Sequence, residues 1–197
     1  MKKQPSVLTS SSGQSLAEFA MVLPILLLMV LGVVEVGYAL LDQLAVTRLS
    51  REGSNLISRD TSIQDAETAI KSMSSSPVNF ANGSTLIFSV VKKGATVGSN
   101  NYNKLVLYQR RQFGTFSGSA QSQVNHAGGS FGGAPDYQAA NSDSDASLQV
   151  TGIPANVVTI TGAMIYITEI FNTHTWITPL NNFGVMAPQT LYSIAYF

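Results

Sequence analysis

The chain has 197 residues, and its 11 Lys and Arg balance its 11 Asp and Glu, so the formal net charge is zero. Charged residues make up only 11% of the chain. Without a basic patch, this composition argues against a nucleic-acid partner. Cysteine is absent, which excludes disulfides, thiolate metal sites, iron–sulfur clusters and thiol catalysis.

The first forty residues contain the strongest pattern. A short basic leader, residues 1–13, precedes an apolar run from Phe19 to Leu41 that holds one interior acid, Glu35. As a helix, this run is long enough to cross the hydrocarbon core of a bilayer. Lys2 and Lys3 predict that the leader stays in the cytoplasm and that the chain after Leu41 lies across the membrane. The run is too long for a signal peptide, and no A-x-A-like cleavage site follows it.

The motif at the start of this run points to a family. The segment Gly13-Gln14-Ser15-Leu16-Ala17-Glu18-Phe19 resembles the processing site of type IV prepilins. Extended through Ala20-Met21-Val22-Leu23-Pro24, it is similar to the TadE family, the minor pilins or pseudopilins of tight-adherence (type IVc, Flp) pili. The resemblance covers roughly Gly13 to Arg59.

This resemblance implies a role for each motif residue. A prepilin peptidase would cut after Gly13, where the missing side chain lets the backbone approach a protease closely. Gln14 would become the new N-terminus. Glu18 would then pair with the freed α-amino group of its own or a neighbouring subunit, which offsets the cost of a charge in lipid. Pro24 removes one helical hydrogen bond and is expected to kink the helix.

The resemblance also implies a function and a location. We expect a minor pilin that acts in pilus assembly and surface attachment. Its expected partners are the prepilin peptidase, other pilin and minor pilin subunits, an inner-membrane assembly platform and the lipid bilayer. The expected location is the bacterial inner membrane, with a single span and the C-terminal domain outside the cytoplasm, or an extracellular pilus. Two alternatives stay open: a pilus-tip adhesin, and a signal-anchored envelope protein unrelated to pili.

Glu35 has two interpretations. It lies near the far end of the apolar run, so it either marks the outer membrane boundary and snorkels toward water, or contacts another subunit in a helical bundle. Gly32 and Gly37 would allow close backbone approach in the second case.

The expected fold is α+β and pilin-like, with an N-terminal helix over residues 14–60, a membrane span over about 19–41, and an exported domain over 61–197. The helical pattern continues past the span with an apolar face of Leu41, Leu44, Ala45, Leu49, Gly53 and Leu56. Thr61 and Gln64 form a predicted capping box for a second helix. The apolar face of that helix comprises Ile63, Ala66, Ile70 and Met73, and it stops near residues 74–77.

Alternating apolar residues then predict an antiparallel sheet. The first strand covers Thr85 to Lys92, with Leu86, Phe88 and Val90 on one face, and the second covers Lys104 to Phe113. A long strand from Val157 to Asn172, bent or divided at Gly162, and a terminal strand from Leu191 to Phe197 follow.

Residues 114–146 form a Gly- and Ser-rich insertion between strands. A loop of this length is expected to be disordered or to lie on the surface. The alternative is an adhesive loop, because Phe113, Phe116, Phe131 and Tyr137 are interspersed among its small residues.

The sequence offers little catalytic chemistry. His126 and His174 have no metal-ligand spacing and are expected to be polar surface residues. Asn141, Asp143 and Asp145 alternate like the start of an EF-hand loop, but the later Gly and Glu of that motif are missing. We therefore expect no enzyme activity, no cofactor and no metal, and leave an irregular Ca²⁺ site at these three residues open.

Overall fold

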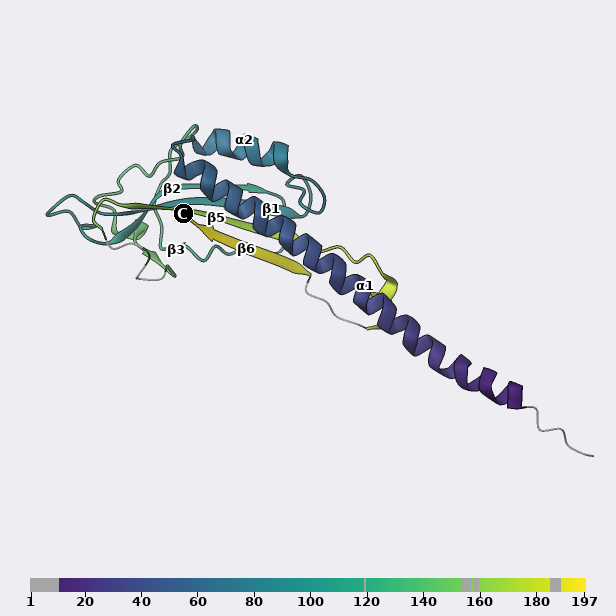
Figure 1. The fold of residues 1–197 in the computed structure, drawn as a ribbon. Helices are drawn as coiled ribbons and strands as arrows, with labels where there is room; N and C mark the ends of the chain where they lie inside the picture. The colour runs from purple at the N-terminus through teal and green to yellow at the C-terminus, as the bar shows by residue number, and fades with distance from the viewer. Residues whose placement is uncertain (1–10, 119, 154–156, 158–159, 185–188) are drawn as a thin grey trace, which may run out of the picture. The chain divides into compact units, whose positions relative to one another are not determined.

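The computed structural model describes residues 11–118, 120–153, 157, 160–184 and 189–197. Residues 1–10 of the predicted leader lie outside this range. The chain divides into two compact units, one of Met1–Ala39 with Trp176–Ala187 and the other of Leu40–Thr175 with Pro188–Phe197. Helix α1 (Ser11–Ser58) contributes to both units. The expected α+β class is confirmed, because a long apolar helix and a short second helix accompany a four-stranded antiparallel sheet (Figure 1).

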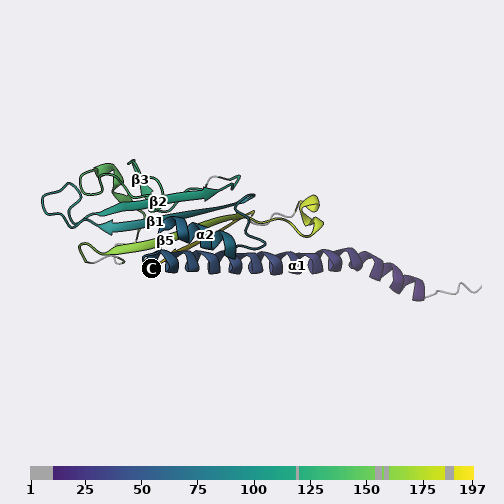
Figure 2. The same ribbon diagram turned by 90° about the horizontal axis from the view of Figure 1, so that it is seen from above.

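In the first unit, α1 exposes large apolar side chains all around its axis. It is the one helix in the described part of the chain that is long and apolar enough to cross a membrane. A helix that is apolar on every side and not covered by protein is suited to lipid. Figure 2 shows that this part of α1 bends toward its N-terminal end. The exposed residues include Leu16, Phe19, Met21, Ile25, Leu27, Met29, Val30, Val33 and Val36.

In the second unit, α1 buries a face that overlaps only partly with the predicted one. Val46, Ser50, Gly53, Ser54 and Ile57 are buried. Of the predicted face, Gly53 is buried, Ala45, Leu49 and Leu56 are partly buried, and Leu41 and Leu44 are exposed. The prediction is therefore right in part: Leu49 and Leu56 pack against the core, whereas Leu41 and Leu44 do not belong to the buried face. It missed Ser50 and Ser54 because it followed apolar residues. The buried stripe includes two serines whose hydroxyls bond to the neighbouring strand.

The N-cap of helix α2 (Ile63–Met73) lies one residue later than predicted. Ser62 is the N-cap, and its hydroxyl accepts a hydrogen bond from the Asp65 backbone N–H at 3.1 Å. The pair Ser62 and Asp65 therefore replaces the predicted Thr61 and Gln64. Met73 is exposed rather than buried, but the end of the helix before residues 74–77 is confirmed.

The sheet has the strand order β2-β1-β5-β6, and every neighbouring pair is antiparallel. The strands are β1 (Ser84–Lys93), β2 (Leu105–Gly114), β5 (Met164–Thr173) and β6 (Thr190–Tyr196). The predicted strands over 85–92, 104–113 and 191–197 are thus confirmed. The predicted strand from Val157 was too long: Gly162 has a φ of +85° in a turn, and β5 starts only at Met164. Residues 158–159 of that prediction lie outside the described range.

Both faces of the sheet are covered. On one face, α2 and the second-unit part of α1 pack on Leu86, Phe88, Val90 and Ile170. On the other face, Val91, Leu107, Ile165 and Ile167 pack with Val124 from the insertion. This second cover explains why Leu86, Ile87 and Phe88 in the central strand β1 are all buried, where the sequence predicted a single buried face.

The insertion over 114–146 is attached to the sheet along the edge strand β2. The Ala139 N–H donates to the Tyr108 carbonyl at 2.7 Å, and the Arg110 N–H donates to the Tyr137 carbonyl at 3.2 Å. These bonds cover backbone groups that an exposed edge would leave open. A small sheet of β3 (Asn125–His126) and β4 (Val150–Thr151) and two short 3₁₀ helices, η1 (Ala146–Leu148) and η2 (Pro179–Phe183), complete the fold. The described part of the insertion is therefore packed structure, not a free loop.

Candidate anchoring and assembly site

The predicted processing residues lie in the first turns of α1. Gly13 is exposed, and a Cβ built on it would meet no atom within 4 Å. Gln14 and Glu18 are also exposed, and the Gln14 side-chain amide donates to Glu18 Oε1 at 3.0 Å. Residues 14 and 18 are one helical turn apart, so an amino group at residue 14 would lie on the same face as the Glu18 carboxylate.

Pro24 lies inside α1, in the part of the helix that exposes its apolar side chains. Farther along the first unit, Met29, Gly32, Val33 and Val36 line a shallow apolar hollow on the helix surface. Gly32 has open space where a Cβ would lie. Small residues on an apolar helix permit close packing of another helix.

Glu35 is buried against its own chain, a contact that neither sequence interpretation included. Its side chain is only 3% exposed and is held by the segment after β5. The Thr178 N–H and hydroxyl donate to Glu35 Oε2 at 2.8 and 2.7 Å, and the Ile177 N–H lies 3.3 Å from both carboxylate oxygens. All three residues belong to the first unit. Glu35 therefore binds its own chain, and snorkelling toward water is not observed.

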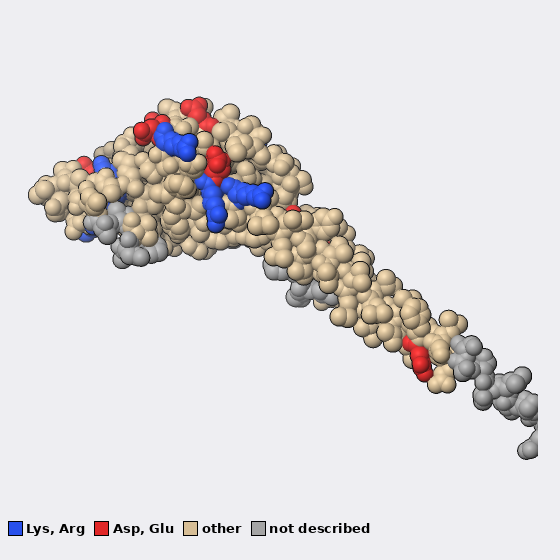
Figure 3. Space-filling view, in the orientation of Figure 1, with Lys and Arg blue, Asp and Glu red and all other residues tan. Residues whose placement is uncertain are grey.

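Charge is unevenly distributed along the chain. Among the described residues of the first unit, Glu18 and Glu35 are the only charged side chains. In Figure 3 the surface of this part of α1 is tan except for an acidic group near its N-terminal end, and the blue and red side chains gather on the second unit. The span between the two acids is therefore uncharged.

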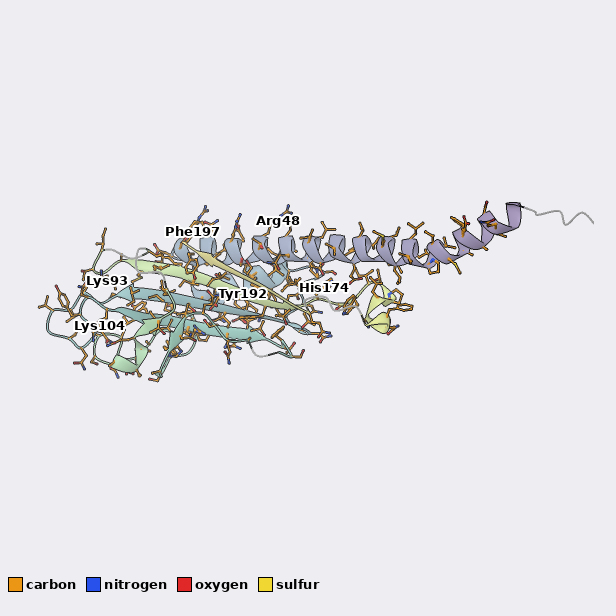
Figure 4. All side chains as sticks on the ribbon, turned by 90° about the horizontal axis from the view of Figure 1, so that it is seen from below. Arg48, Lys93, Lys104, His174, Tyr192 and Phe197 are labelled. Carbon is orange, nitrogen blue, oxygen red and sulfur yellow. The ribbon has the colours of Figure 1, made fainter. Side chains whose placement is uncertain are left out.

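His174 corrects a second expectation. It was predicted to lie on the surface, but it is 3% exposed, and its Nδ1 lies 2.8 Å from Asp42 Oδ2 on α1. Figure 4 labels it at the end of β5, beside the helix. The pair ties β5 to the second-unit part of α1. His126 is half-buried, with Nδ1 2.7 Å from the Gly128 carbonyl.

Glu169 is the buried acid that sequence reasoning missed. It is 0% exposed in the middle of β5, on the face covered by the insertion. It accepts hydrogen bonds from the Ser122 hydroxyl, from the Gln123 N–H at 2.8 Å and from the Tyr192 hydroxyl at 2.7 Å. Burial and the bond to Glu169 raise the pKa of Tyr192, which is labelled in Figure 4. The alternation of side chains along β5 places Glu169 on the face opposite Ile170. The sequence could have indicated that this acid is buried only if the insertion had been known to cover that face.

Arg110 on β2 is the positively charged group near Glu169. Its guanidinium donates to Ser89 Oγ at 2.9 Å. Burial lowers the pKa of Arg110, and the charge of Glu169 opposes that shift. The polar groups under the insertion therefore form a satisfied network, which is a structural use of these side chains.

A second ion cluster joins α2 to β2. Glu67 binds Lys71 on its own helix and Arg111 Nε on β2, the latter at 2.8 Å. Burial pushes the pKa of Glu67 upward, but the hydrogen bonds from Arg111 and Lys71 outweigh it, so the net pKa is lowered. Arg111 also lies over the Tyr137 ring at 4.7 Å. This cluster links helix, sheet and insertion.

The three residues of the possible Ca²⁺ site, Asn141, Asp143 and Asp145, make hydrogen bonds within the protein. Asp143 accepts from the Thr96 hydroxyl at 2.8 Å, and Asp145 caps η1 by accepting from the Ser147 N–H at 2.9 Å. The hydrogen bonds from Ser147 lower the pKa of Asp145. The remaining residue of the motif is Asn141, whose backbone carbonyl accepts hydrogen bonds from the Ser144 and Asp145 N–H groups. Within the described residues, no group of three or more His, Cys, Asp or Glu could hold a metal ion.

Comparison with known proteins supports the resemblance in the N-terminal part. Residues 13–55 match the model of the family described as TadE-like protein. A search of curated proteins and a search of solved structures gave no match. The match begins at Gly13 and extends into the second-unit part of α1. This TadE-like segment indicates a pilin-like protein associated with a tight-adherence pilus, and its one long apolar N-terminal helix fits a single-pass membrane anchor.

Proposed function

We propose that this protein is a minor pilin or pseudopilin that acts in the assembly of a tight-adherence (type IVc) pilus and in surface attachment. The observation that carries the proposal is the TadE-like match that begins at Gly13, on a helix that exposes apolar side chains on every side. The role is structural and not enzymatic. The second unit serves as the domain that the anchor presents outside the cytoplasm.

Processing is the first step of the proposed function. The leader remains in the cytoplasm, and a prepilin peptidase cuts the bond between Gly13 and Gln14. In the uncut chain Gly13 lies in the first turn of α1, so this turn must unwind to give the peptidase an extended backbone. A helix end opens at low cost because its first N–H groups have no intrahelical partner. Glycine lowers that cost further, since it disfavours the helix.

The cut creates the α-amino group with which Glu18 can pair. The new α-amino group at Gln14 is a cation one helical turn from the Glu18 carboxylate, which already accepts a bond from the Gln14 side chain. The same amine can instead pair with Glu18 of a neighbouring subunit. Either pairing lowers the cost of burying both charges in an assembled bundle of apolar helices.

Helix packing then holds the subunit in the assembly. Pro24 removes one backbone hydrogen bond, and we assign the bend of α1 in Figure 2 to it. The hollow at Gly32 offers a place where a neighbouring helix can approach closely. The inner-membrane assembly platform and other pilin subunits are the proposed partners, and the bilayer is the reservoir from which the subunit enters the pilus.

Incorporation of a Glu18 variant tests this function. Glu18→Ala should be made at normal levels and remain in the membrane, but should be nearly absent from pili sheared off the cells. Glu52→Ala is the matched control, because Glu52 is a partly exposed acid of α1 beyond the apolar span. Immunoblots of the sheared and membrane fractions measure both. Normal incorporation of Glu18→Ala would contradict the proposed assembly mechanism.

A further inference from the structure

The segment from Trp176 to Gly184 returns to α1 after strand β5. It belongs to the first unit, together with the apolar part of the helix. Its attachment point is Glu35, whose buried carboxylate accepts bonds from the Ile177 and Thr178 backbones and from the Thr178 hydroxyl. A carboxylate with three donors forms strong, charge-assisted bonds, so this segment is fixed to the helix at one defined level.

The distance from Glu18 to Glu35 is close to the thickness of a bilayer core. Glu18 and Glu35 are separated by 17 residues, which in a helix corresponds to about 26 Å. The hydrocarbon core of a bilayer is about 30 Å thick. If Glu18 lies at one interface, Glu35 and the segment attached to it therefore lie close to the other.

The segment has the side chains that an interface favours. Residues 176–184 contain no charge. Ile177 is 53% exposed and Phe183 is 67% exposed, while Leu180 is buried and holds the short helix η2 in place. Trp176 is partly buried. Aromatic residues concentrate at the level of the lipid headgroups, and exposed apolar side chains beside them gain by entering the acyl boundary.

We propose that Trp176–Gly184 is a lipid-docking loop that rests on the outer interface of the bilayer and is latched to the membrane helix by Glu35. The occupant of its exposed apolar side chains is lipid, because they continue the uncharged, apolar surface of α1 at the same end of the span. The loop sets how deeply the anchor is immersed. This inference rests on α1 crossing a bilayer, which is part of the proposed function.

Trp176 provides the test, because it is the only tryptophan of the chain. The full chain is reconstituted into phosphatidylcholine vesicles at a low protein-to-lipid ratio. Its emission is then quenched by lipids brominated either near the carbonyl or near the methyl end of the acyl chain, and by acrylamide in water. We expect a blue-shifted emission that is protected from acrylamide and quenched most by bromine near the carbonyl end.

Three variants separate docking from folding. Ile177→Ser with Phe183→Ser should lower lipid quenching severalfold and increase acrylamide quenching. Glu35→Leu keeps the span apolar but removes the latch, and should give the same change. Val97→Ser is the matched control, because Val97 is a highly exposed apolar residue of the second unit, and it should leave both kinds of quenching unchanged.

Resistance of the protein to alkaline extraction from the vesicles reports the anchor separately. If the protein resists extraction while Trp176 is quenched by acrylamide and not by either brominated lipid, the lipid-docking loop is wrong and the anchor stands. If lipid protection appears only at high protein-to-lipid ratios, a second copy covers the loop and the proposal is wrong. If the protein is extracted, both the loop and the membrane anchor of the proposed function are wrong.

Discussion

The two parts of helix α1 treat their side chains in opposite ways. In the first unit, Leu16, Met21 and Val33 stand exposed, although each would be buried in an ordinary domain. In the second unit, Ser50 and Ser54 are fully buried, although each is polar. One helix thus has two kinds of surface. The exposed apolar side chains of the first unit suit the lipid surroundings that we propose for it. Where the helix packs on the sheet, small hydroxyls that find a partner lie inside.

The same contrast applies to the buried acids. Glu35 in the first unit is held mainly by backbone N–H groups and one hydroxyl. Glu169 in the second unit has two hydroxyls, one N–H and the nearby charge of Arg110. A buried carboxylate is tolerated only when several donors surround it, and the two units provide them in different ways. Substitutions in the first unit and in the second unit should therefore have separate effects on stability.

The largest effect is expected from Glu169→Ala. It removes the acceptor of three donors and the negative charge near the partly buried Arg110, so we expect the second unit to lose about 3–5 kcal/mol of stability. Urea unfolding of the full chain in detergent, followed by tyrosine circular dichroism, measures the loss. Glu52→Ala is the control and should change little. A loss no larger than that of Glu52→Ala would mean that the network does not hold the sheet to the insertion.

A pair of glycine variants compares the two parts of α1 directly. A Cβ at Gly53 would lie 2.8 Å from Thr168 Cγ2, whereas one at Gly37 would meet no atom within 4 Å. Gly53→Leu should therefore cost about 1–3 kcal/mol through overpacking against the sheet. Gly37→Leu should leave the stability of the second unit unchanged. Equal effects of the two variants on urea unfolding would show that α1 does not pack on the sheet at Gly53.

A smaller effect is expected at the buried hydroxyls. Ser54 Oγ donates to the Ala195 carbonyl of β6 at 2.9 Å, so Ser54→Ala should cost about 1 kcal/mol. Ser58 offers the matched control, because its hydroxyl donates to the Asn55 carbonyl within the same helix. Hydrogen exchange of the β6 amides should increase in Ser54→Ala and stay constant in Ser58→Ala. The reverse order would contradict the assigned contact.

The smallest effect concerns pH and Glu67. Because its pKa is lowered in the folded protein, its contribution to stability is fully present above the ordinary carboxyl pKa of about 4.3. That contribution is lost as the pH falls through the lowered, folded value. Lys71 is half-exposed, so solvent screening limits the contribution to less than about 1 kcal/mol. The stability difference between wild type and Glu67→Gln should therefore shrink on acidification, and a difference independent of pH would contradict this linkage.

The sequence predicted what local patterns determine. The apolar span, α2 and strands β1, β2 and β6 followed from periodicity and from turn residues. The buried face of α1 followed only in part, because Ser50 and Ser54 carry no apolar signal and are buried by partners distant in the sequence. Glu35, His174 and Glu169 were misjudged or missed for the same reason. Each is buried by hydrogen-bond partners, and those partners at Thr178, Asp42 and Ser122 are placed only by the tertiary fold.

The packing of the insertion over residues 114–146 was also not predicted from local sequence patterns. Its composition predicted a loop, and most of its described residues are irregular, but its backbone bonds to the β2 edge and its residue Val124 enters the second core. A few apolar side chains spread through a Gly- and Ser-rich segment give no periodic signal. Only the open edge and open face of the sheet determine where such side chains pack.

If this chain is a processed pilin-like subunit, its mass and N-terminal sequence, measured on protein from membranes, should show the cut. The protein is expressed with and without a prepilin peptidase, alongside Gly13→Leu and the control Gly37→Leu. We expect a mature chain that starts at Gln14 only when the peptidase is present. Gly13→Leu should stay uncut, and Gly37→Leu should be cut normally. A chain that keeps residues 1–13 in both conditions, or one that starts beyond Leu41, would contradict the account.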